Sequence, residues 1–245
     1  MSEPISVIIP VFNAAAYLEE AVASIRRQKH SVGEIIIVDD GSTDDSVAIA
    51  SRLGDDIRII TQENTGPAAA RNRGIRSANH DIIAFLDADD LWPDDKLELQ
   101  LPVLLDDPTV DMVLGLLSFF RDDHEKPGGR ELLPPIFLFV VGCGLYRRRV
   151  FEIVGLFNES MRFGEDTDWF MHSREAVLRS KIVKAGSILY RRHAGNLTSR
   201  MDLSAEGFIR ALKQSLDRRR ADAKGLASQL PNFDPEDIIE VPGRE

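Results

Sequence analysis

Short apolar runs alternate with helix-like segments through the N-terminal part of the chain. Four runs have the length of strands, at residues 5–11, 34–40, 57–60 and 82–87. Apolar side chains elsewhere recur at helical spacing and predict helices at residues 17–28, 46–53, 68–78 and 96–105. Runs with little polar interruption are typical of strands buried on both faces. This alternation predicts an α/β fold, with a parallel sheet and helices on both faces.

The C-terminal part is less regular. We expect strands at residues 110–120 and 181–190, a further apolar segment at 136–146, a short helix from Arg147, and longer helices at 165–174 and 202–223. The polar residues 121–130 contain Pro and Gly and are interpreted as a mobile loop. The residues after the last helix contain three prolines and are interpreted as a loose tail.

Composition narrows the class of protein. The 245 residues carry a net charge of −10, which argues against a nucleic-acid-binding protein, because such proteins present a basic surface. An acidic protein that binds an anion needs local arginines or a metal ion. The single cysteine, Cys143, excludes an intrachain disulfide, and its apolar neighbours favour a buried structural thiol. Neither a signal peptide nor an apolar run of about 20 residues is present, so we expect a cytoplasmic protein without a transmembrane segment.

Acidic residues follow the fourth apolar run. Asp87 and Asp89 would project to the same side of a strand, because side chains alternate along it. Two adjacent carboxylates repel each other, and Mg²⁺ or Mn²⁺ would relieve this because both ions prefer oxygen ligands. The alternative is an acidic loop that caps the next helix, and we accept that interpretation for Asp94 and Asp95. Ligands of parallel sheets bind at the carboxyl ends of the strands, which favours a metal at Asp87 and Asp89.

Five short motifs then occur in order along the chain. They are Val7 to Asn13, Ile37 to Asp44, Asn64 to Asn72, Leu86 to Asp90 and Gly164 to Trp169. Together they resemble the family 2 inverting glycosyltransferases of the GT-A fold, over residues 5–199. The resemblance implies a mixed, mainly parallel central sheet. It also implies a glycosyltransferase domain at residues 1–200, with a nucleotide-sugar-binding half at 1–107 and an acceptor-binding, catalytic half at 108–200. Residues 201–245 remain as a C-terminal helix and tail.

The resemblance implies a nucleotide-sugar donor, with UDP as the usual nucleotide, and inversion at the anomeric carbon. The residues that would hold the nucleotide are Pro10, Val11, Asn13, Asp39, Asp40, Arg71 and Asp87. A carboxylate suits uracil because it accepts the ring N–H. The alternative for Asp39 and Asp40 is a cap on the Gly41-Ser42 turn, and one of the two could have only that role.

The same resemblance assigns the metal and the base. Asp87 and Asp89 match its metal-binding aspartates, with Asp90 as a candidate third, and a Mg²⁺ or Mn²⁺ ion would bridge both phosphates. His193 could contact the metal or have only a structural role, and Arg191 and Arg192 could add charge opposite the phosphates.

Asp166 matches the general base of the family, with Glu165 beside it. The alternative is that these acids, with Asp168, only complement a helix N-terminus, which is the interpretation we favour for Asp168. Trp169 could stack on a sugar but is assigned to the core.

For the acceptor, only a broad chemical class is predicted. A saccharide or a lipid-linked glycan is expected, in a polysaccharide biosynthesis role, and a lipid-linked acceptor would bring the chain to the inner face of the membrane. Acceptor choice is expected in residues 121–130 and 158–164, where the motifs are weakest.

Three competing functions were weighed. A phosphoryl-accepting receiver domain would leave the chain beyond residue 136 without a role, and a dinucleotide-dependent oxidoreductase would need a glycine-rich motif that is not present. A non-catalytic nucleotide-sugar-binding protein of the same fold stays open, because only turnover separates it from the enzyme.

Overall fold

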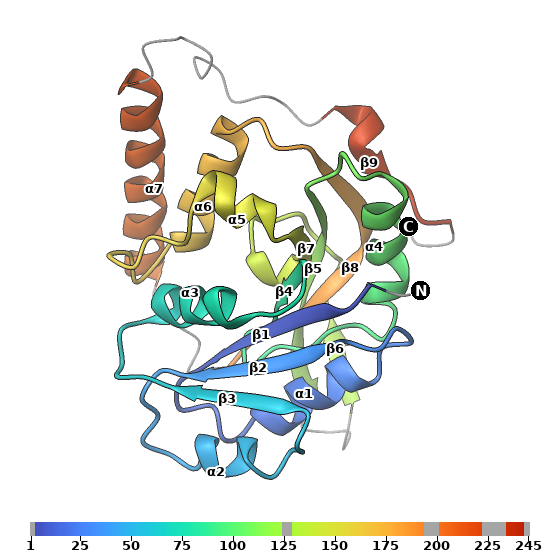
Figure 1. Cartoon of the computed structure of the whole chain (residues 1–245), viewed down its shortest axis with the longest axis vertical. Helices are drawn as coiled ribbons and strands as arrows, with labels where there is room; N and C mark the ends of the chain where they lie inside the picture. Colours follow the sequence, from blue (N-terminus) through green and yellow to red (C-terminus); the bar gives the residue numbers. More distant parts are fainter. Residues whose placement is uncertain (1–2, 124–128, 194–200, 222–233, 243–245) are drawn as a thin grey trace.

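The N-terminal part follows the predicted alternation. The computed structural model describes residues 3–123, 129–193, 201–221 and 234–242 (Figure 1). Its first strands are β1 Ile5–Val11, β2 Glu34–Asp39, β3 Ile57–Thr61 and β4 Ile82–Phe85. The helices that connect or follow them are α1 Leu18–Arg26, α2 Ser46–Ala50, α3 Pro67–Ser77 and α4 Lys96–Asp106. The predicted elements are therefore all present, with ends that differ by a few residues.

One sheet runs through the molecule. Among the described residues its strand order is β3-β2-β1-β4-β7-β5-β8-β9, with β6 paired to β5. The added strands are β5 Met112–Asp123, β6 Gly129–Leu132, β7 Gly144–Arg147, β8 Ser180–Arg191 and β9 Ile238–Ile239. β7 is antiparallel to both β4 and β5, whereas β5 and β8 are parallel. The sheet is therefore mixed but mainly parallel, as the resemblance implied.

Helices cover both faces of the sheet. On one face, α1 and α4 pack through residues such as Leu18 and Leu97 against Ile9 of β1. On the other face, α3 packs with α5 Arg149–Val154 and α6 Glu165–Glu175 against Phe85 and its neighbours. Alternating side chains of each central strand enter the two cores, which is why the strands read as continuous apolar runs.

The last long helix, α7 Met201–Ala221, packs on α6 (Figure 1). Gly164, at the start of α6, lies so close to α7 that an added Cβ would be 2.7 Å from the backbone of Gly207. Arg218 of α7 pairs with Asp168 at 2.8 Å and with Glu175. Asp168 therefore holds α7 on α6 as well as standing in the first turn of a helix, which the sequence interpretation did not include.

Two loop predictions are wrong where the structure describes the residues. β5 extends to Asp123 and pairs with β6, so only residues 124–128 of the expected loop lie outside the described residues. In the expected tail, β9 pairs in parallel with β8, and Lys184 bonds Glu240 at 2.6 Å. Both segments are polar or rich in Pro, but backbone hydrogen bonding to an edge strand does not depend on side-chain pattern. In the described part of the chain, no helix combines the length and apolarity needed to cross a membrane.

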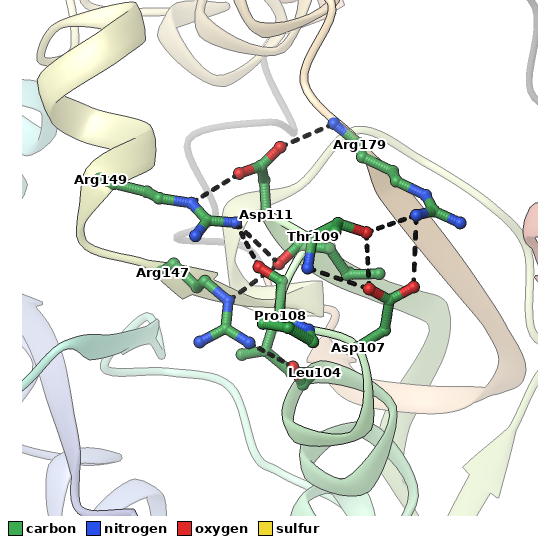
Figure 2. Close-up of polar contacts among 9 residues, drawn as sticks. Leu104, Asp107, Pro108, Thr109, Asp111, Arg147, Arg149 and Arg179 are labelled. Atoms are coloured by element: carbon green, nitrogen blue, oxygen red, sulfur yellow. Dashed lines mark hydrogen bonds and ion pairs between the residues drawn. The ribbon is translucent and has the colours of Figure 1, made fainter.

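A group of ion pairs closes the sheet edge where β5 and β8 begin and β7 ends (Figure 2). We call it the Asp111 cluster, made of Asp107, Asp111, Arg147, Arg149 and Arg179. Asp111 accepts a bond at 2.8 Å from the side chain of Arg149 and another from the backbone N–H of Arg179. The remaining arginine N–H groups of Arg147 and Arg149 reach backbone carbonyls of residues 104–110. These contacts fix the turn between α4 and β5. The turn lies at the edge of the sheet opposite the one where β1, β2 and β4 end.

Candidate active site

The candidate residues meet at the edge of the sheet where β1, β2 and β4 end. Asp39 ends β2, and the turns after these strands carry Asn13, Asp40, and Asp87 with Asp89. α6 brings Glu165 and Asp166 to the same place, since both lie within 3.3 Å of Arg71, which also bonds Asp87. The structure therefore brings the predicted donor and base residues together, in the position expected for ligands of such sheets.

Arg71 is the centre of this arrangement, and we call Arg71, Asp87, Glu165 and Asp166 the Arg71 cluster. Its guanidinium is buried and bonds Glu165 at 2.7 Å, Asp87 at 2.8 Å and Asp166 at 3.3 Å. Burial lowers the pKa of Arg71, but the three carboxylates together raise it well above the usual value. Its Nε has no hydrogen-bond partner among the residues that the structure describes, so this buried donor keeps unused capacity. The sequence assigned Arg71 to the nucleotide alone and did not reveal that it joins the two halves of the domain.

Asp166 has both carboxylate oxygens directed by fixed donors. Oδ1 accepts from Arg71, and Oδ2 accepts at 3.1 Å from the backbone N–H of Val141. Burial raises the pKa of Asp166 to about 7; Arg71 opposes the rise, whereas Glu165 and Asp87 add to it. A carboxylate whose pKa lies near neutral pH is suited to accept a proton during a reaction.

The first turn of α6 explains where its acids lie. The helix starts after Gly164, whose φ of +74° favours glycine, and Glu165, Asp166 and Asp168 stand in its first turn. Glu165 is committed to Arg71 and Asp168 to Arg218. Trp169 is in the core as predicted, with its indole N–H donated to the carbonyl of Gly155.

The argument from strand alternation for Asp87 and Asp89 is wrong. β4 ends at Phe85, and residues 87–90 form a turn closed by a bond from Asp90 N to Asp87 O. Asp87 bonds Arg71, while Asp89 lies 3.0 Å from Nε2 of His193. The period of two applies only within the strand, so the directions of these side chains depend on the turn.

A divalent cation fits this turn. Burial and the neighbouring charge of Asp87 raise the pKa of Asp89, so a positive charge here would stabilise its ionised form. Asp90 is fully buried, and one of its oxygens finds no hydrogen-bond partner in the described ranges of the chain. No group of three protein ligands occurs among the described residues. Mg²⁺ and Mn²⁺ are commonly held by one or two carboxylates together with substrate phosphates, so Asp87, Asp89 and His193 suit such an ion better than a closed site.

Arg191 stabilises the acidic turn at residues 87–90. It is buried at the end of β8, where its side chain donates to the carbonyl of Asp89 and its backbone N–H donates to Asp90. Its guanidinium also pairs with Glu20 and lies over the ring of Tyr17. These contacts join Arg191 to the acidic turn and to Glu20, and whether it also adds charge opposite the phosphates stays a prediction. A loop assignment placed it at the surface, whereas β8 extends to it and buries it.

The turn after β2 is held by its own acids. Both oxygens of Asp40 are occupied, because they accept from the backbone N–H groups of Thr65 and Gly66 and from the side chain of Gln62. Within the described part of the chain, Asp39 accepts only from the backbone N–H of Ser42, at 3.2 and 3.4 Å, and keeps acceptor capacity. Both acids therefore stabilise turns, and Asp39 retains the freer carboxylate.

The end of β1 contributes mainly backbone groups to the candidate site. Val11 is buried and its carbonyl accepts from Asp40 N, and Pro10 is half-buried beside it. Asn13 has a φ of +52° and its side chain accepts from the backbone N–H of Thr43, which joins the turns after β1 and β2. Between them, Phe12 is 51% exposed. The sequence analysis did not single out Phe12, although an apolar residue between a strand and an Asn turn was a usable signal.

Two more residues of the site were missed. Tyr17 stacks on His193 with ring centroids 4.7 Å apart, and so orients the imidazole that faces Asp89. Val141 contributes only its backbone N–H. Tyr17 lies near a motif and could have been identified from the sequence. The Val141 N–H could not, because a backbone donor does not depend on the residue type.

Known proteins resemble the chain in sequence. The family model for glycosyl transferase family 2 matches residues 6–183. An uncharacterised glycosyltransferase of Rickettsia typhi is 34% identical over 202 residues, which cover 73% of this chain and 64% of the relative. The uncharacterised glycosyltransferase EpsJ of Bacillus subtilis is 30% identical and is covered over 62% of its length. The chain thus spans less than two thirds of the length of these relatives.

Solved structures resemble it in fold. Staphylococcus aureus TarS, in a complex with UDP-GlcNAc, has a TM-score of 0.72 at 20% identity, covering 91% of this chain and 68% of that one. The mannosyltransferase PcManGT from Pyrobaculum calidifontis, with GDP-Man and Mn²⁺, has a TM-score of 0.67 at 20% identity, covering 89% and 65%. At this identity the likeness shows a shared fold. With the family match over most of its length, the chain belongs to glycosyl transferase family 2.

Proposed function

We propose that this chain transfers a sugar from a nucleotide-sugar donor, with UDP as the first candidate, to an acceptor hydroxyl with inversion. The observation that carries the proposal is the Arg71 cluster. One buried guanidinium holds Asp166, a carboxylate with a pKa near neutral pH, next to Asp87 of the donor-side turn. A base and a donor site must lie side by side for a direct displacement at the anomeric carbon.

The nucleotide would lie over the turns after β1 and β2. Asp39 is the better candidate for the uracil N–H, because its carboxylate accepts from one protein donor, whereas Asp40 accepts from several. Asp40 would then act by holding residues 62–66, and a direct contact from Asp40 stays a prediction. Pro10, Val11 and Asn13 would shape the same pocket. The UDP-GlcNAc bound by TarS and the GDP-Man bound by PcManGT support a nucleotide-sugar donor.

Asp87, Asp89 and His193 would hold a Mg²⁺ or Mn²⁺ ion. Such an ion supplies positive charge to the diphosphate as it leaves. Residues of the chain prepare the turn for it: Arg191 holds the carbonyl of Asp89, and Tyr17 stacks on His193. The Mn²⁺ in PcManGT supports this choice.

Asp166 would accept the proton of the acceptor hydroxyl as the oxygen attacks the anomeric carbon. Arg71 and the Val141 N–H hold its oxygens, which limits its rotation before the acceptor arrives. Glu165 raises the pKa of Asp166 through its negative charge and shares Arg71 with it, and it is therefore a positioning residue. A saccharide or a lipid-linked glycan would be the acceptor, and the latter would place the chain at the inner membrane surface. Residues 158–164, which precede α6, would help to select it.

The donor site can be tested by calorimetry. A panel of UDP-, GDP- and dTDP-sugars is titrated into the chain with Mn²⁺ or with a chelator. We expect at least one UDP-sugar to bind more tightly with the metal, and Asp89→Ala to abolish the difference. Asp94→Ala is the matched control, because Asp94 is an exposed acid paired with Arg27 outside the site. Equal affinities with and without metal, for every sugar in the panel, would refute the metal assignment.

Turnover separates an enzyme from a binding protein. Release of the nucleoside diphosphate from the best donor is measured with a set of saccharide acceptors and with water alone. We expect release that depends on the metal and on Asp166. Tight binding without release in any mixture would support the non-catalytic alternative.

A further inference from the structure

A single turn supplies the backbone donor that faces Asp166. The 3-10 turn η1, Val141–Cys143, precedes β7, and the N–H of Val141 donates to Oδ2 of Asp166 at 3.1 Å. The turn is buried, so its polar groups need partners inside the protein. Its geometry therefore decides where the Val141 N–H points.

Buried side chains donate hydrogen bonds to the three backbone carbonyls of the turn. The hydroxyl of Tyr146 donates to the Val141 carbonyl at 2.9 Å. The ammonium of Lys96 donates to the Gly142 carbonyl at 3.0 Å. The Cys143 carbonyl accepts from Gln100 at 2.8 Å and from Ser187 at 3.0 Å. Three successive carbonyls are thus held by side chains from α4, β7 and β8.

Lys96 is the unusual member of this set. It is fully buried, rests 5.2 Å from the centre of the Trp92 ring, and has its pKa lowered to about 7 by burial. Burying a lysine is costly, so a solvent-exposed position would be the default for this residue type. Lys96 opens α4, the helix that follows the acidic turn, and its ammonium reaches the turn that contacts the base.

We propose that η1 is the positioning element of the base, and that Lys96 and Gln100 act through it by keeping the Val141 N–H directed at Asp166. This inference rests on the proposed function, because it assigns a role to the neighbours of Asp166. Lys96 and Gln100 are positioning residues: the contacts above join them to the turn. A donor to Oδ2 favours the ionised carboxylate, so losing it should raise the pKa of Asp166 further and misdirect its oxygens.

The Val141 amide allows a test without any substrate. The chain is labelled with ¹⁵N-valine, the Val141 signal is assigned by Val141→Ile, and its shift is followed against pH in the presence of a chelator. We expect a midpoint near the Asp166 pKa of about 7, and loss of this titration in Asp166→Asn. Arg71, Asp87 and Glu165 face Asp166, and Lys96, whose pKa is also lowered to about 7, faces the turn, so only the change that Asp166→Asn abolishes is assigned to Asp166.

Two matched variants separate positioning from general destabilisation. Lys96→Met and Arg147→Met each replace a cation by Met and leave backbone carbonyls without a donor, but Arg147 belongs to the Asp111 cluster. We expect only Lys96→Met to move the Val141 midpoint to higher pH. In diphosphate release from the best donor, Lys96→Met should lower kcat by about 10–100-fold with an unchanged donor KM. Arg147→Met should lower Tm alone.

Two further substitutions leave the net charge unchanged. They test whether Lys96→Met acts only by removing the positive charge of the ammonium. A Cβ added at Gly142 would lie 2.5 Å from Cδ1 of Ile188. Ile188 is fully buried, so Gly142→Ala is expected to displace the turn, and a change in the position of the Val141 signal checks that it does. Ile188→Val removes that methyl group and should restore both the Val141 titration and kcat in the double variant, while Ile188→Val alone stays close to the parent. This pair also serves if Lys96→Met fails to fold.

The outcomes are distinct. If Gly142→Ala keeps the parent Val141 titration and kcat, the positioning role of the turn is refuted. The same holds if Ile188→Val fails to restore either. If Asp166→Asn releases diphosphate at the parent rate, the base assignment itself is wrong, whatever the turn variants do.

Discussion

Two clusters of arginine and acidic side chains stand at opposite edges of the sheet, with opposite balances of charge. The Arg71 cluster has one arginine and three carboxylates, and its arginine is buried. The Asp111 cluster has three arginines and two carboxylates, and its surplus N–H groups reach backbone carbonyls (Figure 2). The second cluster is complete without a ligand, since its surplus donors find acceptors in the chain.

The difference supports the proposal that the Arg71 cluster, and not the Asp111 cluster, takes part in the reaction. Burial raises the pKa of Asp166, and the negative charges of Glu165 and Asp87 add to the rise, whereas Arg71 opposes it. The pKa of the neighbouring Asp89 is raised mainly by burial and then by Asp87. A cation and a proton donor would relieve this repulsion, which matches the proposed metal and acceptor. In a structural ion-pair cluster, each charged group is paired within the protein. In a ligand-binding site, some charged groups lack a full set of protein partners.

The largest effect should come from the base. Asp166→Asn keeps the shape of the side chain but cannot take a proton, so we expect transfer to fall by about 10²–10⁴-fold. Donor affinity should stay close to the parent value. Initial rates and donor binding are measured on the same preparations, with circular dichroism as a check on folding. Asp111→Asn is the control from the other cluster, and it should lower stability without changing the rate. Equal rate losses in both variants would contradict the contrast between the clusters.

Removing the central arginine should distinguish the clusters by stability. Arg71→Met leaves three carboxylates without their shared cation, and breaking a buried ion pair lowers the free energy of unfolding by about 3–5 kcal/mol. Arg149→Met removes a half-exposed partner of Asp111, and we expect a loss of about 0–1 kcal/mol. Urea denaturation at pH 8 measures both. Similar losses would mean that burial of Arg71 carries no special weight.

The pH dependence of stability should follow the raised pKa of Asp166. Its folded-state pKa of about 7 lies above the ordinary value of 3.8, so the folded chain binds more protons than the unfolded chain between these values. The contribution of Asp166 to stability should therefore fall as pH rises from about 4 to about 7, by up to about 1.4 kcal/mol per unit. Denaturation with a chelator present measures the slope, and Asp166→Asn should remove this part of it. A slope that is the same in Asp166→Asn would place the titration on another group.

The proposed reaction needs the opposite charge state from the one that favours folding. Asp166 must be ionised to accept a proton, whereas its buried site stabilises the protonated form at low pH. The repulsion within the Arg71 cluster is therefore part of the proposed mechanism, with stability lost at the pH at which the base is active. The Asp111 cluster carries no such conflict, because no group in it needs to change its charge.

Local pattern determined much of this molecule. The apolar runs located β1 to β4, and the helical spacing located the helices between them, because both signals repeat over a few residues. The motifs also located Asp39 and Asp40 at the end of the second strand and Glu165 and Asp166 at the start of a helix, as in the structure. These inferences needed only side-chain identity and spacing. The failures began where a segment depended on a distant strand, as at β6 and β9.

Tertiary structure alone decided how the site is connected. Arg71 and Glu165 are 94 positions apart, and Asp89 and His193 are 104 apart, so no local period links them. The Val141 N–H belongs to the backbone, which is the same for nearly every residue, and its role came only from the turn that directs it. The sequence determined which groups were present, and the packing of α3, α4 and α6 around one sheet edge decided which of them meet.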